Sequence, residues 1–263
     1  MAGGMTIASL LEPITGQPGP VRLTHAADWL QGRTLYGGAS ALVAYTMATR
    51  AFPGLPPLRS AQVAFVAPVG EDITLSAEMI RQGRSVTQVR SEIRVDDKLA
   101  LSALWLFAEG REANAFHPSV PPEDWPGPPE DNAQVTHSYA PSFVAKNFEL
   151  RHGQTKGEDR GATVRRWARL TEEHSLDPAA KLVLMGDVMP PGAMRAMRRQ
   201  GPISSINWSF NVLNPESQSR DGWYLAENAS QHADNGYSSE RLRLWDADRR
   251  QVLDGMQSVA VFG

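Results

Sequence analysis

The chain has 263 residues, of which 41% are hydrophobic and 21% are charged, the proportions of an ordinary soluble globular protein. Its formal net charge of −3 leaves no basic excess to neutralise phosphates, which argues against a general nucleic-acid binder. The absence of cysteine excludes disulfides, thiolate nucleophiles and thiolate metal sites, and it fits a reducing compartment.

No apolar run approaches the roughly 18 residues of a membrane span, and the first twenty residues lack the pattern of a secretory signal. The six histidines show no metal-ligand spacing, and the sequence contains no phosphate-binding loop or G-x-S-x-G elbow. We therefore expect a soluble cytoplasmic protein without a metal site or cofactor.

The first half of the chain predicts one helix followed by antiparallel strands. Residues 1–20, with four glycines and three prolines, predict an extended arm. Gly37 and Gly38 open a helix rich in small residues, which Pro53 and Gly54 end. Alternating patterns predict strands over 73–79 and 89–95, and an apolar run predicts a third over 99–107.

A segment rich in proline separates this half from the next. Residues 110–140 include PPEDWPGPPEDN and show little periodicity, so we expect a linker that is ordered only where Trp125 finds a surface. Strands are then predicted over 143–150 and 162–170. Asp177 and Pro178 form a good helix start, and Pro190-Pro191 is expected to stop that helix. Further strands are predicted over 203–212, 222–232, 236–246 and 250–262.

The chain repeats itself. Residues 60–108 and 205–263 each follow a helical stretch and read as strand, strand, acidic turn and strand. The aligned copies pair Gln62 with Asn207 and Ser102 with Gln257. We expect an α+β protein divided into an N-terminal unit over 20–110, a linker over 111–140 and a C-terminal unit over 141–263.

These motifs together resemble a known family. Tyr36-Gly37-Gly38 opening a small-residue helix, the strands RSAQVAFVAPV and GRSVTQVRSEI, and the ending MQSVAVF are similar to acyl-CoA thioesterases of the hotdog fold. Two units in one chain resemble the double-hotdog thioesterases related to acyl-CoA thioesterase II. The resemblance implies two fused hotdog units, each a helix on an antiparallel sheet.

The resemblance also implies a trio of an Asp, a Ser or Thr and a Gln that holds and activates a water. Carried over by position, the Asp falls on Asn207, the hydroxyl on Ser230 or, one residue earlier, on Ala229, and the Gln on Gln257. The family carboxylate is therefore replaced by an amide that cannot accept a proton at neutral pH.

The residues themselves support parts of this site. Helix N-termini carry free N–H groups, so Gly37 and Gly38 are candidates for binding an acyl carbonyl, although they could equally serve a turn and tight packing. Gln257 interrupts an apolar strand face and would need hydrogen bonds, either to a water or to a loop carbonyl. Asn207 shares its face with polar residues, which is typical of a solvated strand face.

Three residues could replace the missing base. His232 and Asp234 lie beside the aligned hydroxyl position, and histidine titrates near neutral pH. Asp187 lies late in the second predicted helix, where single-hotdog thioesterases often carry a carboxylate. A solvated surface role is the competing interpretation for each.

We therefore expect an acyl-CoA thioesterase that cleaves a fatty or other acyl thioester with a bound water and no covalent intermediate. The predicted site is Asn207, Ser230 and Gln257, with the substrate carbonyl at Gly37 and Gly38. The alternative is a non-catalytic acyl-thioester binder that has lost its carboxylate. A hotdog hydratase is less favoured because its Asp-and-His signature is not evident. Because hotdog sheets are commonly covered by a second chain, we expect a homo-oligomer.

Overall fold

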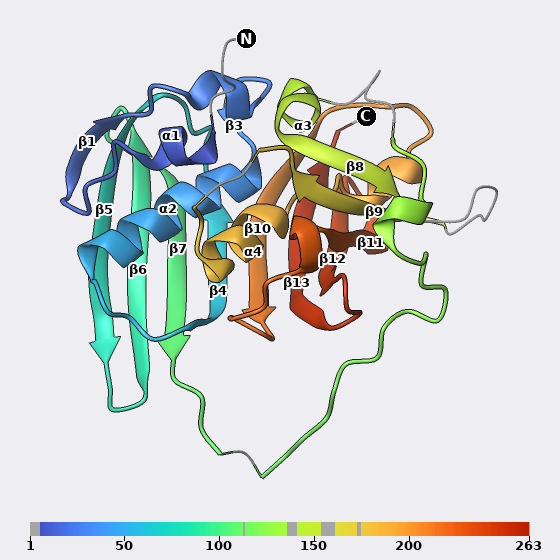
Figure 1. Cartoon of the computed structure of the whole chain (residues 1–263). Helices are drawn as coiled ribbons and strands as arrows, with labels where there is room; N and C mark the ends of the chain where they lie inside the picture. Colours follow the sequence, from blue (N-terminus) through green and yellow to red (C-terminus); the bar gives the residue numbers. More distant parts are fainter. Residues whose placement is uncertain (1–5, 113, 136–140, 154–160, 173–174, 263) are drawn as a thin grey trace.

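The computed structural model describes residues 6–112, 114–135, 141–153, 161–172 and 175–262. In this part of the chain, 11 strands form one antiparallel sheet, and helices α2 and α4 lie side by side on one of its faces (Figure 1). The sheet confirms the predicted α+β class. No helix of the described residues is long and apolar enough to cross a membrane.

The strands follow one another across the sheet in the order β1 (Gly19–Arg22), β5 (Asp72–Gln82), β6 (Val86–Val95), β7 (Lys98–Ala108), β4 (Leu58–Phe65), β10 (Ile203–Val212), β13 (Gln251–Val261), β12 (Tyr237–Asp246), β11 (Tyr224–Asp234), β9 (Thr163–Leu170) and β8 (Phe148–His152). A separate hairpin pairs β2 (Leu30–Gln31) with β3 (Thr34–Leu35). The α-helices are α1 (Ile7–Leu11), α2 (Gly37–Ala51), α3 (Ser142–Asn147) and α4 (Pro178–Met185). The 3-10 helices are η1 (Ala26–Trp29), η2 (Pro129–Asp131), η3 (Gly192–Arg195) and η4 (Arg220–Gly222).

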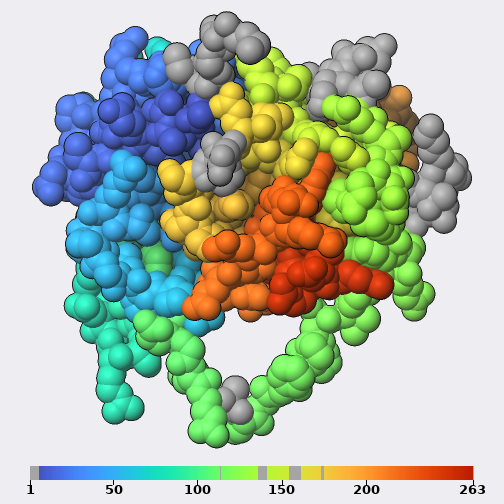
Figure 2. Space-filling view, viewed as in Figure 1, coloured from blue at the N-terminus to red at the C-terminus, as the bar shows by residue number. Residues whose placement is uncertain are grey.

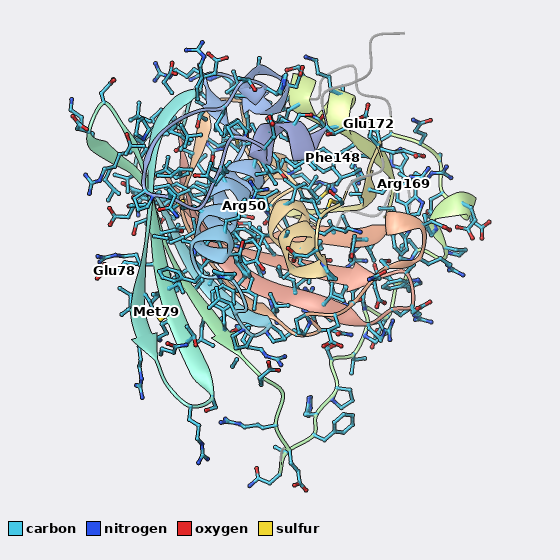
Figure 3. The ribbon with its side chains drawn as sticks, turned by 60° about the vertical axis from the view of Figure 1, so that its left-hand side comes forward. Arg50, Glu78, Met79, Phe148, Arg169 and Glu172 are labelled. Carbon is cyan, nitrogen blue, oxygen red and sulfur yellow. The ribbon has the colours of Figure 1, made fainter. Side chains whose placement is uncertain are left out.

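The prediction of an extended N-terminal arm is wrong for the described residues of this segment. Ile7, Leu10 and Leu11 are buried on one side of α1, and Thr6 caps the helix. The guanidinium of Arg50 in α2 (Figure 3) donates to the carbonyl of Leu11 at 2.8 Å. Apolar residues at helical spacing, and not the glycines and prolines around them, determine this segment.

Two further boundaries differ from the prediction. The segment expected as a strand over 143–150 begins as helix α3, because Pro141 precedes its first residue and the Asn147 side chain donates to the carbonyl of Phe143 at 3.0 Å. Strand β8 starts only at Phe148. Helix α4 begins at Pro178 with Asp177 as N-cap, as predicted, but it ends at Met185, before the prolines are reached.

The linker is anchored by Trp125, as predicted. Its ring meets that of Trp167 edge to face at 5.4 Å, beside a cluster of buried side chains that includes Trp223 and Trp245. The guanidinium of Arg249 lies 5.3 Å from the Trp125 ring. The N-terminal part of the linker arches away from the body of the molecule (Figure 2), and Phe116 there is 92% exposed.

The two halves are joined by strands β4 and β10, which pair directly. Val63 lies opposite Trp208, and one continuous row of inward-facing residues crosses the sheet from this pair. In the first half the row continues through Ala103, Ser91 and Ala77, and in the second through Gln257, Glu240 and Ser230. With Gln62 kept as the counterpart of Asn207, the register makes Ala103 the counterpart of Gln257. The predicted pairing with Ser102 is therefore one residue off.

A cluster of aromatic side chains fills the space between the halves at the start of α2. Tyr36 stacks on Phe143 with ring centroids 4.6 Å apart, and Phe148 meets both rings edge to face. Phe148 lies near the middle of the molecule in Figure 3, whereas Glu78 and Met79 lie at the edge of the first half. The Tyr36 hydroxyl donates to the carbonyl of Leu184 in α4. This contact fixes the N-terminus of α2 against the end of α4.

We predict that Trp125→Ala destabilises the protein by about 2 kcal/mol, because it removes a half-buried aromatic ring from the tryptophan cluster. Urea unfolding measures the change, and proteolysis of the linker should accelerate. Phe116→Ala is the matched control in the same linker, and its exposed ring predicts no change in the free energy of unfolding. Equal effects of the two substitutions would contradict this role for Trp125.

Candidate functional site

The N-terminus of α2 is unusually accessible to other groups because it begins with two glycines. A side chain at Gly37 would overlap the carboxylate of Asp187, and a Cβ at Gly38 would lie 2.5 Å from the carbonyl of Leu184. Glycine is therefore required at both positions by close approach of the second half. The Gly37 N–H has no protein partner among the described residues and Gly37 is partly exposed, so this N–H is free to bind a ligand.

Asp187 is the acidic group that meets this helix end. Asp187 directly follows Gly186, the C-cap of α4. A Cβ at Gly186 would lie 2.6 Å from the Trp208 ring, so the absence of a side chain there lets the end of α4 pack closely on Trp208. The carboxylate accepts hydrogen bonds from the Gly38 N–H and from the Gln257 amide, the latter at 2.9 Å. Asp187 thus lies between an α2 glycine of the first half and a β13 amide of the second.

Gln257 is the inward-facing polar residue that the sequence identified. It is only 2% exposed, and its Nε2 donates to Asp187, so the predicted need for a hydrogen bond is met by a carboxylate. Its amide oxygen has no protein partner among the described residues. Gln257 can therefore hold the carboxylate with its nitrogen and accept a hydrogen bond from a water with its oxygen.

The surroundings of Asp187 make it a weaker acid than an ordinary aspartic acid. Burial raises its pKa from 3.8 to about 7, and the hydrogen bonds from Gln257 and Gly38 offset only part of that effect. The residue nonetheless retains partial solvent exposure. A carboxylate that exchanges protons near neutral pH beside an open N–H donor has the properties of a general base.

Glu240 is a second inward-facing carboxylate, directly opposite Gln257 on the neighbouring strand. It is fully buried and accepts hydrogen bonds from the N–H groups of Gly192 at 2.8 Å and Ala193 at 3.3 Å, and from the Ser238 hydroxyl. The segment from Asp187 to Ala193 is therefore held at both ends, by Gln257 at one and by Glu240 at the other. Glu240 is in phase with Leu242 and Leu244 on an alternating strand, and this pattern indicates an inward-facing carboxylate that the sequence analysis missed.

Ser230 does not reach Gln257. It lies in the same row but two strands away, with Glu240 between them. Its hydroxyl is 2.8 Å from that of Ser238, and η3 packs on its backbone, where a Cβ at Gly192 would lie 2.6 Å from the Ser230 nitrogen. The covering turn separates Ser230 from Asp187. Ala229, the alternative position for the hydroxyl, points to the other face of the sheet because adjacent strand residues alternate.

Asn207 lies on the opposite face of the sheet from Gln257. It is exposed, it pairs with Ser258, and its side-chain oxygen accepts from the Ser258 N–H at 3.2 Å. Because Gln257 is the neighbour of Ser258, the two amides point to opposite faces. A bulge in β10 just before Asn207 accompanies this orientation. The structure thus brings together Gly37, Gly38 and Gln257 of the predicted site, but not Asn207 or Ser230.

Of the three candidate bases, only Asp187 lies at this site. His232 and Asp234 are exposed near the end of β11, where Asp234 accepts from the N–H of Asn235 at 2.8 Å in the turn that follows. Their position is that of a solvated hairpin. No group of three or more histidine, aspartate or glutamate side chains among the described residues could hold a metal ion.

Fold and site together define a protein in which two fused hotdog units share one composite site. Solved structures with this architecture include a hot dog fold protein from Alicyclobacillus acidocaldarius, which is 19% identical with a TM-score of 0.81 over 95% of this chain and 97% of that chain. An acyl-CoA thioesterase II from Mycobacterium marinum is 16% identical, with a TM-score of 0.72 over 98% of both chains. A tesB protein from Mycobacterium avium subsp. paratuberculosis is 18% identical, with a TM-score of 0.73 over 97% of this chain and 100% of that chain. These likenesses establish the predicted double-hotdog fold.

Family models identify the chain more closely. The acyl-CoA thioesterase N-terminal domain matches residues 25–108, and the acyl-CoA thioesterase C-terminal domain matches residues 118–261. The comparison with curated proteins finds no match. The chain belongs to the acyl-CoA thioesterase family.

We predict that Asp187→Asn stabilises the protein more at pH 8 than at pH 5. Because the folded-state pKa lies above the ordinary value, the favourable contribution of the neutral acid is complete below about pH 4 and is lost as the pH rises through about 7. The partly exposed site reduces the full effect, so we expect a gain of about 1–2 kcal/mol at pH 8. Urea unfolding at both pH values measures it, and a gain independent of pH would contradict the assignment.

We predict that Glu240→Gln destabilises the protein by about 2 kcal/mol, because its amide cannot accept from both backbone N–H groups of η3. Hydrogen exchange of the peptide covering 186–196 should become faster. The exposed Glu172→Gln is the control and should change neither measurement. Unchanged exchange in the Glu240 variant would show that the carboxylate does not hold this segment.

Proposed function

We propose that this protein hydrolyses acyl-CoA-type thioesters with a water activated by Asp187 and held by Gln257. The observation that carries the proposal is the hydrogen-bonded pair of Asp187 and Gln257 at the open N-terminus of α2. The proposal keeps Gly37, Gly38 and Gln257 from the sequence-based site and replaces Asn207 by Asp187 as the polar partner of the water. Membership of the acyl-CoA thioesterase family supports the substrate class.

In the proposed reaction, the ionised Asp187 accepts a proton from the water while the water oxygen attacks the thioester carbonyl carbon. The amide oxygen of Gln257 accepts the second O–H of that water and so orients it. A pKa of about 7 leaves about half of the carboxylates ionised at neutral pH. The ionised form of Asp187 is therefore present at neutral pH, and it is basic enough to accept the proton of the water.

The carbonyl oxygen becomes negative as the water attacks, and the N-terminus of α2 is suited to stabilise it. The free Gly37 N–H would donate to this oxygen, and the partial positive charge of the helix end acts in the same direction. When the intermediate collapses, the carbon–sulfur bond breaks and the proton on Asp187 passes to the leaving thiolate. The products are a carboxylic acid and a free thiol, and no acyl group is bound to the protein at any step.

The second candidate is a non-catalytic acyl-thioester binder. It is favoured by one observation, that the Gly38 N–H is already bonded to Asp187 and so is not open to a substrate carbonyl. In that case the chain binds acyl-CoA at the helix end but does not turn it over. The cytoplasmic location and the homo-oligomeric assembly expected from the sequence stay predictions in either case.

We predict that free-thiol release from a panel of acyl-CoAs detects turnover by the wild type and that Asp187→Asn lowers kcat/KM by about 100-fold or more, as expected for loss of a general base. Gln257→Ala should lower it by about 10-fold, the effect of one hydrogen bond. The wild-type rate should rise as the pH increases through about 7 and then level off, because the base must be ionised.

Asn207→Ala is the matched control for Gln257→Ala, because it removes an amide from the opposite face of the sheet and should leave the rate unchanged. Intact-mass measurement of the quenched reaction should find unmodified protein. A wild type that binds acyl-CoA but releases no thiol from any member of the panel would establish the binder instead. Full activity in Asp187→Asn would refute the proposed base.

A further inference from the structure

The antiparallel helices α2 and α4 create two related ends, and only one of them is the site described above. At the other end, the N-terminus of α4 lies beside the C-terminal half of α2. Helix α2 begins with Gly37 after the N-cap Tyr36, whereas α4 begins with Pro178 after the N-cap Asp177. Proline has no N–H, and the Asp177 carboxylate accepts from the Ala180 N–H at 2.8 Å. The N-cap of this end is therefore a carboxylate, whereas the N-cap of α2 makes no side-chain capping hydrogen bond and leaves the Gly37 N–H free.

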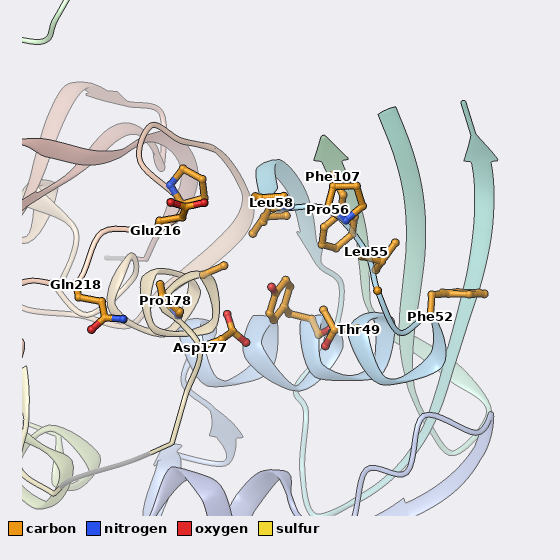
Figure 4. Close-up of a pocket in the computed structure, with 15 residues that line it drawn as sticks. Thr49, Phe52, Leu55, Pro56, Leu58, Phe107, Asp177, Pro178, Glu216 and Gln218 are labelled. Carbon is orange, nitrogen blue, oxygen red and sulfur yellow. The ribbon is translucent and has the colours of Figure 1, made fainter. Parts of the chain in front are cut away.

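A pocket of about 510 Å³ opens at this second end (Figure 4), a volume within the range of small-molecule sites. Its two sides differ in character. Asp177 and Glu216 lie on the side of α4, and Leu55, Phe52 and Phe107 lie on the opposite side, towards the sheet. No lysine or arginine is among the lining residues. The pocket therefore has an acidic end and an apolar end.

Tyr45 places a polar group in this pocket. Its side chain lines the pocket and the residue is only 5% exposed, yet its hydroxyl has no hydrogen-bond partner among the described residues. Burial, and then the charge of Asp177, raise the pKa of the Tyr45 hydroxyl, which stays protonated. A buried hydroxyl without a protein partner is expected to bond to a ligand or a water.

We propose that this pocket is a second binding site, for an apolar molecule that carries a terminal ammonium group. The ammonium would lie between Asp177 and Glu216, with the Tyr45 hydroxyl as an additional acceptor, and the apolar body would cover Phe52, Leu55 and Phe107. A phosphate-bearing acyl thioester does not fit, because the carboxylates of Asp177 and Glu216 repel phosphates. The site is separate from Asp187 and does not depend on the proposed hydrolysis.

Calorimetry of the full chain with octylammonium, octanoate and octanol tests this proposal directly. We expect octylammonium to bind at least 10-fold more tightly than octanoate, with octanol in between, and its affinity to fall as salt is added. The double substitution Asp177→Asn with Glu216→Gln should weaken octylammonium binding at least 10-fold. Asparagine is also a good N-cap, so α4 is expected to remain folded.

Thr49→Trp, which fills the pocket from α2, should abolish binding, and Tyr45→Phe should weaken it several-fold. The exposed Glu172→Gln, which removes a carboxylate outside the pocket lining, is the control and should bind as the wild type does. Thermal unfolding verifies that each variant is folded. Absence of octylammonium binding, equal affinities for octylammonium and octanoate, or wild-type affinity in the double variant would each overturn the proposal.

Discussion

The direct pairing of β4 with β10 is the constraint on which the rest of the structure depends. Residues 207–211 lie opposite residues 60–64, so the sheets of the two halves become one. Each half carries its helix on the same face, and the pairing therefore brings α2 and α4 together in opposite directions (Figure 1). Each helix N-terminus then meets the C-terminal end of the other helix. Neither half alone contains such an end.

The two ends are made of different residues, although the framework that forms them is shared. In the inward-facing row of the sheet, Ala103 and Ser91 of the first half correspond to Gln257 and Glu240 of the second. The second half therefore supplies the polar groups that hold Asp187 and η3, and the first half supplies the glycine helix end. Duplication provides the shared framework, and substitution at inward positions of the second half provides the polar groups of the first end. The acidic character of the second end comes from the helix cap Asp177 and the loop residue Glu216.

Holding a carboxylate at the first end costs folding free energy, because burial opposes its ionisation. Three groups limit that cost and fix its position. The Gln257 amide and the Gly38 N–H bond to the carboxylate, and the hydroxyl of Tyr36 ties the end of α4 to the start of α2. A carboxylate whose pKa is raised in this way can take up and release a proton near neutral pH, which supports the proposal of Asp187 as the base.

The sequence by itself determined the class of fold, most strands, the glycine start of α2 and the need of Gln257 for a hydrogen bond. These follow from local pattern: alternation along a strand, small residues along a helix, and an amide in phase with apolar neighbours. It misjudged residues 6–18, where four apolar side chains outweighed the glycines and prolines. The polar residues in phase with Asn207 indicated a solvated strand face, and the structure places Asn207 on an exposed face; its role in the site was implied only by the resemblance.

Only the tertiary structure decided which polar residues meet. Asp187 and Gln257 are 70 residues apart in sequence, and Asp187 lies outside any regular pattern, so no periodicity connects them. Their contact with Gly38 depends on the pairing of β4 with β10 and on the length of α4, which ends before the prolines. The same geometry places Glu240 between Gln257 and Ser230. Local pattern predicts the face on which a side chain lies, but its partner is determined by packing between elements that are distant in the chain.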